Sequence, residues 1–145
     1  MFYIAADHAG HHLKKDLEQL FKNQNIEYED LGAKSYDEKD DFVDFAVPLA
    51  KKVVETGSKG VLICGSGHGM CMAANKIQGV RAIVGYSISG TELGRKHNDA
   101  NILCLAGRVV TKDHALAIIK TFLNTEFSGE ERFVRRNKKI ADLEK

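Results

Sequence analysis

The chain has 145 residues, of which 43% are apolar and 28% charged, enough for one domain with a sizeable core. Its 21 Lys and Arg residues nearly balance its 20 Asp and Glu residues, so a formal charge of +1 gives no broad positive surface for nucleic acid. No apolar run approaches the roughly 20 residues that cross a bilayer, and the N-terminus lacks the features of a signal peptide. We expect one domain over residues 1–145, cytoplasmic, that binds neither nucleic acid nor membrane.

Short apolar segments alternate with longer amphipathic ones, which is typical of a mostly parallel sheet covered by helices. In chain order, strands are predicted over Phe2–Ala6, Ile26–Leu31, Gly60–Cys64, Arg81–Gly85 and Ile102–Ala106. The last three are nearly continuous apolar runs, as in strands buried on both faces. We therefore predict a three-layer α/β/α sandwich around a five-stranded parallel sheet, with the strand order 2-1-3-4-5.

Helices are predicted between these strands, where apolar residues recur at helical spacing over residues 13–21, 42–54 and 115–122. A shorter helix is expected over Ser87–Lys96, and the segment Lys34–Asp41 is interpreted as a solvated loop. The charged C-terminal helix, Glu130–Glu144, carries apolar residues that need a surface to pack on. A neighbouring subunit could provide that surface.

Reactive side chains follow several of the predicted strands. Asp7 and His8 follow the first strand, the segment Cys64–Gly69 follows the third, and Arg108 follows the fifth. Ligands of open α/β sheets bind beyond the carboxyl ends of the strands, where the strand order reverses. With strands one and three at that point, Asp7 and His8 would face the Cys64 loop across one crevice.

The loop after the third strand has glycines at alternate positions, Gly65, Gly67 and Gly69, before a helix expected to begin near Met70. Its backbone N–H groups could form an anion cradle at the helix N-terminus. A plain tight turn, with Ser66 as the helix cap, fits the same residues. The spacing matches neither the Walker loop nor G-x-G-x-x-G, so no nucleotide cofactor is expected.

The cysteines differ in what their positions allow. Cys64, near a helix N-terminus, could be a base or a small buried apolar residue. Cys71 lies inside a predicted helix and Cys104 in the middle of a strand, so both are interpreted as buried apolar residues. The three are too few and too oddly spaced for a disulfide framework, so we expect reduced thiols.

Histidines and arginines supply further candidates. His97, between a helix and the fifth strand, could transfer protons or simply cap the helix. His8 and His12 form a helical i, i+4 pair, but no carboxylate or thiol obviously completes a metal site, so no metal is expected. Arg132 and Arg136, one turn apart, could reach one phosphate or belong to a solvated face.

Several motifs together resemble a known family across essentially the whole chain. They are Asp7-His8-Ala9-Gly10, Asp41-Phe42, Cys64-Gly65-Ser66-Gly67 with Ala73-Ala74-Asn75-Lys76, Gly79-Val80-Arg81-Ala82, His97-Asn98-Asp99-Ala100-Asn101, Gly107-Arg108-Val109-Val110, and Arg132 with Arg136. In this order and spacing the chain resembles the type B ribose-5-phosphate isomerases and the related galactose-6-phosphate and allose-6-phosphate isomerases.

The resemblance implies a metal-free and cofactor-free aldose–ketose isomerase with a Rossmann-like fold, forming a homodimer whose active sites combine residues of both subunits. By the family pattern Cys64 would move a proton between C2 and C1, and His97 would help to open the furanose ring. The remaining roles would be enediolate stabilisation by Ser66 and the loop Gly65, Gly67, His68 and Gly69; contacts to the sugar by Asp7 and Asn98; and phosphate binding by His8, Arg108, Arg132 and Arg136.

The chain departs from the usual family pattern at a few positions. Phe42-Val43 stands where Tyr-Pro is usual, and Ser66 replaces a frequent Thr. His68 replaces an apolar residue, and Phe133 stands where His is usual. Some relatives lack the cysteine and have Glu where this chain has Met70, which favours Cys64 as the base here. A six-carbon sugar phosphate is an alternative substrate, and a non-catalytic sugar-phosphate sensor is an alternative function.

Overall fold

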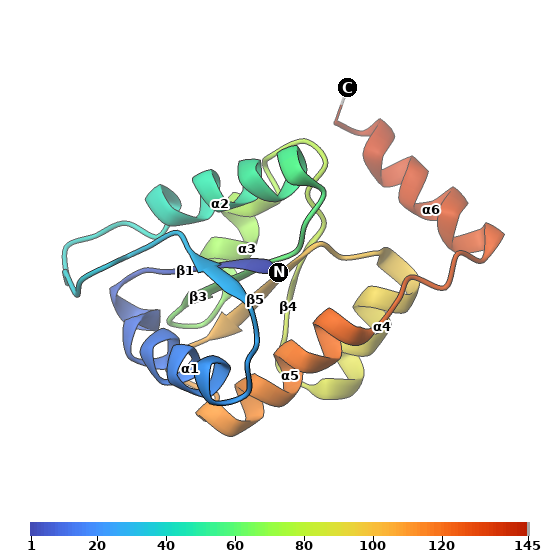
Figure 1. Ribbon diagram of the computed structural model, residues 1–145. Coiled ribbons are helices and arrows are strands. Elements are labelled where there is room, and N and C mark those ends of the chain that lie inside the picture. The colour runs from blue at the N-terminus through green and yellow to red at the C-terminus, as the bar shows by residue number, and fades with distance from the viewer. Residues whose placement is uncertain (145) are drawn as a thin grey trace.

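Five parallel strands form one sheet at the centre of the molecule (Figure 1). The computed structural model describes residues 1–144. Its strands are β1 (Phe2–Ala6), β2 (Tyr28–Asp30), β3 (Gly60–Cys64), β4 (Ala82–Val84) and β5 (Ile102–Ala106). All pairings are parallel, which confirms the predicted α/β fold, although β2 and β4 are shorter than expected.

The structure corrects the predicted strand order. The observed order is β2-β1-β3-β5-β4, so β5 pairs with β3 along its whole length and β4 lies at the edge. Every residue of β5 is buried, whereas the three residues of β4 are only half-buried. A fully apolar strand gains most from a central place, and a short strand suits an edge. Because β1 and β3 are still neighbours, the crevice expected between their carboxyl ends does not depend on this correction.

Helices cover both faces of the sheet (Figure 1). The predicted helices are present; α4 also includes His97 and Asn98, which were expected to follow it, and the helix after β3 begins two residues earlier than Met70. The helical elements are η1 (His8–Gly10), α1 (His11–Asn23), α2 (Val43–Thr56), α3 (His68–Ala74), α4 (Ile88–Asn98), α5 (Lys112–Asn124) and α6 (Glu131–Asp142). In Figure 1, α2 and α3 lie on one face, and α1, α4 and α5 on the other.

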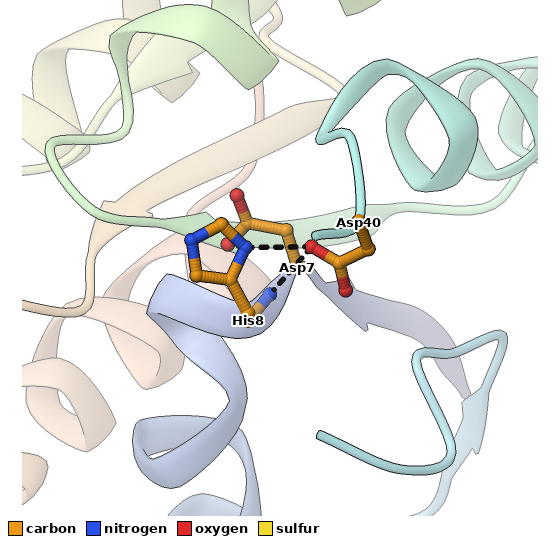
Figure 2. Close-up of side chains that lie close together, drawn as sticks. All are labelled: Asp7, His8 and Asp40. Carbon is orange, nitrogen blue, oxygen red and sulfur yellow. Dashed lines mark hydrogen bonds and ion pairs between the residues drawn. The ribbon is translucent and has the colours of Figure 1, made fainter. Parts of the chain in front are cut away.

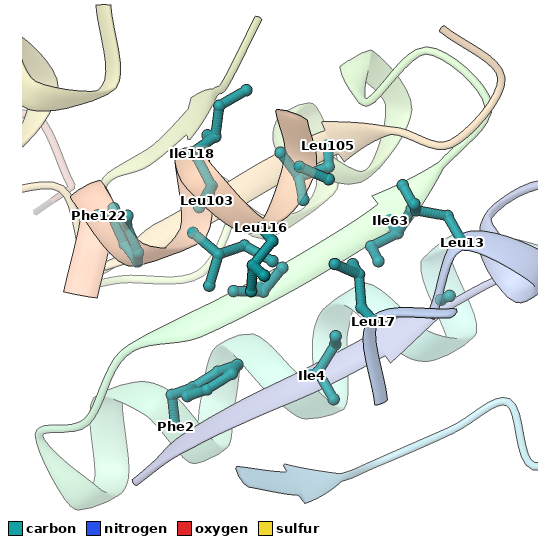
Figure 3. Packing of buried hydrophobic residues seen from close by; sticks show 14 of the residues in the cluster. Phe2, Ile4, Leu13, Leu17, Ile63, Leu103, Leu105, Leu116, Ile118 and Phe122 are labelled. Carbon is teal, nitrogen blue, oxygen red and sulfur yellow. The ribbon is translucent and has the colours of Figure 1, made fainter. Parts of the chain in front are cut away.

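Alternate strand residues supply two cores, one on each face of the sheet. Ile4 and Ile63 belong to one core together with Leu17 of α1 and Phe122 of α5 (Figure 3). Their neighbours along the strands, such as Leu62, pack against α2 and α3 in the other core. This alternation follows from the period of two in a β-strand, and burial on both faces holds the strand ends in fixed positions.

A buried ion pair ties α1 to the end of β2. The Lys14 side chain is fully buried, and its Nζ donates to Asp30 Oδ1 at 2.7 Å and to the Ala33 carbonyl at 2.8 Å. Burial is the largest single effect on Asp30 and opposes its ionisation. The hydrogen bonds from Lys14 and the Gly32 amide, together with the charges of Lys14 and Lys34, outweigh burial and lower the pKa of that carboxyl. These bonds anchor the start of the segment that leads from β2 to α2.

The C-terminal helix α6 extends away from the sheet and contacts α4 (Figure 1). Phe133 at its start is buried, but Ile140 and Leu143 remain 45% and 83% exposed. Both residues border a hollow beside the edge strand β4. Within residues 1–144, no helix has both the length and the apolar character needed to span a membrane.

Candidate active site

The carboxyl ends of β1 and β3 meet through a very close backbone approach. The Asp7 amide donates to the Ile63 carbonyl at 3.3 Å, and Asp7 Oδ1 accepts from the Gly10 amide at 3.1 Å. A Cβ at Gly10 would lie only 2.3 Å from the Ile63 carbonyl oxygen, so this position has no room for a side chain. Glycine therefore allows the turn that follows β1 to rest on β3.

The predicted Cys64 loop turns directly from β3 into α3. Cys64 ends the strand, and Gly67 adopts the left-handed conformation, with φ of 85°, at the N-cap of the helix. The Ser66 hydroxyl accepts from the His68 amide at 3.3 Å, while the Tyr86 hydroxyl donates to the Ser66 carbonyl at 2.6 Å. The first N–H groups of a helix have no acceptor within it, so this turn presents donors to a ligand.

A hollow of about 450 Å³ opens beside this loop and is of the size that holds a small metabolite. The Phe42 ring lies against Gly69, and the Arg108 side chain lies beside Gly65. A buried thiol, a hydroxyl, a guanidinium group and a glycine turn therefore border one space. The lining residues are Phe42, Cys64, Gly65, Ser66, Gly69, Arg108 and Val109.

The second part of this edge is a trio of Asp7, His8 and Asp40 (Figure 2). One oxygen of Asp40, Oδ1, accepts from the His8 amide at 3.0 Å and lies 2.7 Å from His8 Nδ1. Asp40 belongs to the segment predicted as a solvated loop, and for this residue the prediction is wrong because its side chain is only 10% exposed. The chain places it 32 residues from His8, so no local pattern reveals the pair.

Burial and charge act on this trio in opposite directions. Burial raises the pKa of Asp7, against the lowering effect of its hydrogen bond from Gly10. The hydrogen bond with Asp40 raises the pKa of His8, and Asp7 acts in the same direction. Arg108 opposes this shift as a nearby cation. The site thus combines cationic groups with carboxylates that can accept hydrogen bonds from hydroxyls.

Within residues 1–144, Asp7, His8 and Asp40 offer donor atoms within 4.8 Å of one another, close enough to share a metal ion. In the structure, His8 Nδ1 is paired with Asp40 instead. His12, the other member of the His8–His12 pair considered from the sequence, is not part of this group. Its ring stacks on Tyr36, with the centroids 5.9 Å apart.

The other two cysteines lie behind the site. Burial raises the pKa of Cys104, and the side-chain hydrogen bond to Cys104 lowers the pKa of Cys71. Cys104 is fully buried in β5, as predicted, and Cys71 is half-buried in α3 with its thiol donating to the Ala82 carbonyl. All three cysteines are free thiols.

The remaining predicted residues form a separate cluster where α4 meets α6. The His97 ring stacks on Phe133, with centroids 4.3 Å apart and planes at 16°. The guanidinium groups of Arg132 and Arg136 lie 4.5 and 5.8 Å from the same Phe133 ring. Arg132 and Arg136 therefore share one face of α6, as their spacing predicts. Asn98 joins the cluster through Asn137.

The Cys64 site and the His97 cluster lie at opposite ends of the strands. His97 and Asn98 precede β5, and the Asn98 carbonyl accepts from Arg81, which precedes β4, so both belong to the amino ends of the strands. Cys64 lies at a carboxyl end. A strand of five residues is about 16 Å long. One chain therefore does not bring His97 to Cys64.

Comparison with known proteins decides the family. A family model described as "Ribose/Galactose Isomerase" matches residues 2–140. The chain belongs to the ribose/galactose isomerase family. A probable ribose-5-phosphate isomerase B of Mycoplasma genitalium is 43% identical over 145 residues, covering 99% of this chain and 95% of the relative. Ribose-5-phosphate isomerase B of Mycobacterium tuberculosis is 38% identical over 144 residues, covering 99% and 89%.

Solved structures of this isomerase family have the same fold. The Mycoplasma genitalium ribose-5-phosphate isomerase B with bound ribulose 5-phosphate superimposes with a TM-score of 0.92 at 41% identity, covering 99% of this chain and 95% of that one. A type B enzyme of Trypanosoma cruzi gives 0.90 at 40% identity, with the same coverage. The family and the kind of enzyme, an isomerase, are as predicted from the sequence.

Proposed function

We propose that this isomerase interconverts D-ribose 5-phosphate and D-ribulose 5-phosphate in the hollow at the carboxyl edge of the sheet. One observation carries the proposal: the Cys64 thiol and the Arg108 guanidinium group border the same hollow as the glycine turn. In the proposal these groups supply a base, an anion-binding cation and hydrogen-bond donors to one small ligand. The relatives named for this reaction match the chain along nearly all of its length.

In the proposed reaction, Cys64 acts as the base. Its thiolate takes the proton from C2 of the open-chain aldose, and the C2–H electrons form the C1–C2 double bond while the C1 carbonyl becomes an enediolate oxygen. The thiol exchanges its proton with solvent, and a proton passes from O2 to O1. Cys64 then delivers a proton to C1, which leaves the carbonyl at C2. One base serves both carbons because the enediolate is planar, and no hydride moves to a redox cofactor.

In the proposed reaction, the turn after Cys64 stabilises the negative charge that develops on the enediolate. Ser66 and the N–H groups of Gly65–Gly69 are the donors we assign to the enediolate, because donors fixed before the reaction cost no reorganisation during it. Gly67 at the N-cap of α3 allows this turn. Asp7, whose buried carboxylate accepts from Gly10, is assigned to the sugar hydroxyls.

Phosphate binding supplies orientation in this proposal. His8 and Arg108 lie at the carboxyl ends of the strands. Arg132 and Arg136 lie beside His97 at the other ends, so in this proposal a second subunit contributes them as the second pair of cations. Guanidinium groups bind phosphate oxygens through paired hydrogen bonds. A bound phosphate would hold C1 and C2 over Cys64 and so lower the entropic part of the barrier.

We further propose a homodimer whose active sites combine both subunits. Cys64 and His97 lie at opposite ends of the strands in one chain, so ring opening by His97 beside Cys64 requires a partner's His97. The exposed Ile140 of α6 and Leu143 directly after it offer apolar surface for that partner. A two-fold axis would then create two equivalent sites.

Mixed dimers test the shared site. Cys64→Ser and His97→Asn proteins are each expected to be inactive, but co-refolding them yields mixed dimers with one intact site each. Random pairing restores about a quarter of wild-type activity if the site is shared. If each chain builds its own site, the mixture stays inactive.

The substrate is tested by proton NMR in deuterated buffer containing EDTA. Ribose 5-phosphate should give ribulose 5-phosphate with deuterium at the exchanging carbon, and EDTA should not slow the reaction. Turnover of allose 6-phosphate or galactose 6-phosphate, without turnover of ribose 5-phosphate, would show that the substrate is a six-carbon sugar phosphate. Binding of all three without turnover or deuterium exchange would favour a sugar-phosphate sensor.

A further inference from the structure

Building on the proposed function, we infer that Asp40 is a positioning residue that holds the His8 imidazole as a charged phosphate ligand. Asp40 neither borders the hollow beside Cys64 nor belongs to the motifs that identify the family. Asp40 acts through His8, to which it is hydrogen-bonded although the two residues lie 32 positions apart in the sequence.

The geometry fixes both the position and the tautomer of His8. A single oxygen, Asp40 Oδ1, accepts from the His8 backbone amide at 3.0 Å and pairs with Nδ1 at 2.7 Å (Figure 2). With the carboxylate as acceptor, Nδ1 must carry a proton, and Nε2 is left to bind a ligand. The two bonds resist rotation of the ring about its side-chain torsions.

The surrounding charges favour the imidazolium form. Asp40 and Asp7 are the carboxylates that act on His8, and both raise its pKa. Arg108 lowers it, as does partial burial. The Tyr36 ring lies edge-on at 6.4 Å and carries no charge near neutral pH. Asp40 therefore offsets the repulsion that two neighbouring cations, His8 and Arg108, would otherwise have.

The second oxygen of Asp40 gives independent support. Oδ2 is buried and has no hydrogen-bond partner within residues 1–144. An unpaired buried carboxylate oxygen destabilises the fold, so a purely structural role would favour a residue with fewer unmet hydrogen bonds. The Asp40 carboxylate is therefore better explained by the effect of its charge on His8, the neighbour that binds the ligand.

The charge on His8 matters in the pH range where a sugar phosphate becomes a dianion. A phosphomonoester loses its second proton near pH 6. Raising the His8 pKa above its ordinary 6.5 extends the range in which imidazolium and dianion coexist. Phosphate should therefore bind tightly up to a higher pH than it would if His8 had no Asp40 partner.

Asp40→Asn separates charge from shape, because the amide oxygen can still accept both His8 hydrogen bonds. We expect an increase of about tenfold in KM for ribose 5-phosphate at pH 7.5, an increase that shrinks as the pH falls below 6, with kcat within twofold of wild type. Glu38→Gln is the matched control, since it removes one exposed carboxylate from the same segment. It should leave KM unchanged at every pH.

Side-chain ¹⁵N NMR of His8 measures the pairing without turnover. In the free enzyme, His8 should titrate at lower pH in Asp40→Asn than in wild type, and inorganic phosphate should bind the variant more weakly above pH 7. If wild type lacks isomerase activity but His8 shifts in this way, the substrate is wrong and the Asp40–His8 relation stands. Identical His8 titrations, or a KM ratio that does not vary with pH, would overturn the inference.

Discussion

The buried Lys14–Asp30 pair provides the sharpest stability prediction. Lys14→Met keeps the length and apolar stem of the side chain but removes the ammonium group that contacts Asp30 and the Ala33 carbonyl. Asp30 would keep only its bonds from the Gly32 amide at 2.9 Å and the exposed Lys34 at 3.4 Å. In the variant the Asp30 carboxylate therefore loses its buried cationic partner, and the Ala33 carbonyl loses the Lys14 donor.

Breaking a buried ion pair by removing one partner costs about 3 kcal/mol. Unfolding entropy near 2.1 cal/mol/K per residue makes this equivalent to a decrease in Tm of about 10 °C for a chain of this length. Thermal unfolding followed by circular dichroism, at one protein concentration, measures it. Lys15→Met is the matched control on the same helix, because Lys15 is 48% exposed and its contact with Glu18 is a surface pair.

The pH dependence gives a second readout of the same pair. The folded state lowers the pKa of Asp30, so its stabilising effect is fully present above the unfolded value near 3.9 and is lost as the pH falls through the lower folded value. The difference in Tm between wild type and Lys14→Met should therefore narrow below about pH 4. A Tm shift no larger than that of Lys15→Met, or one that is constant with pH, would refute the assignment.

Three other contacts can each be tested by one substitution. Gly10→Ala places a Cβ against the Ile63 carbonyl and should lower the free energy of unfolding by about 2 kcal/mol in urea titrations; an unchanged midpoint would mean that the backbone relaxes freely. Phe133→Ala removes the surface on which His97 stacks, and kcat should fall about tenfold when ribofuranose phosphate is the substrate; equal activity would show that the stacking does not position His97. Ile140→Asp should convert the proposed dimer to a monomer in sedimentation velocity and abolish turnover together with it; an active monomer would contradict the shared site.

The sequence predicted those features that depend on local pattern. Uninterrupted apolar runs such as Ile102–Ala106 predicted buried strands, and the position of Cys64 after one of them predicted its place at the sheet edge. The strand order required a comparison between strands, and no local pattern shows that β5 rather than β4 pairs with β3.

The parts of the site that sequence reasoning missed are long-range contacts. Asp40 looked like one of several charges in a solvated segment, and only the fold brings it to His8. Lys14 stands in an amphipathic helix where lysine is ordinary, and its burial becomes visible only with Asp30 beside it. In both cases a polar residue is buried because a distant partner satisfies it, which residue type and periodicity do not encode.

The central claim is that Cys64 is the base of a sugar-phosphate isomerase, and the most direct test is the turnover of Cys64→Ser on ribose 5-phosphate. Loss of a general base costs up to about 10⁴-fold, so we predict a decrease of about 10³-fold in kcat, with deuterium incorporation reduced equally and inorganic phosphate bound as in wild type. Cys71→Ser, which alters a half-buried thiol outside the hollow, should remain within about twofold of wild type. If Cys64→Ser keeps its turnover within tenfold of wild type, Cys64 is not the base.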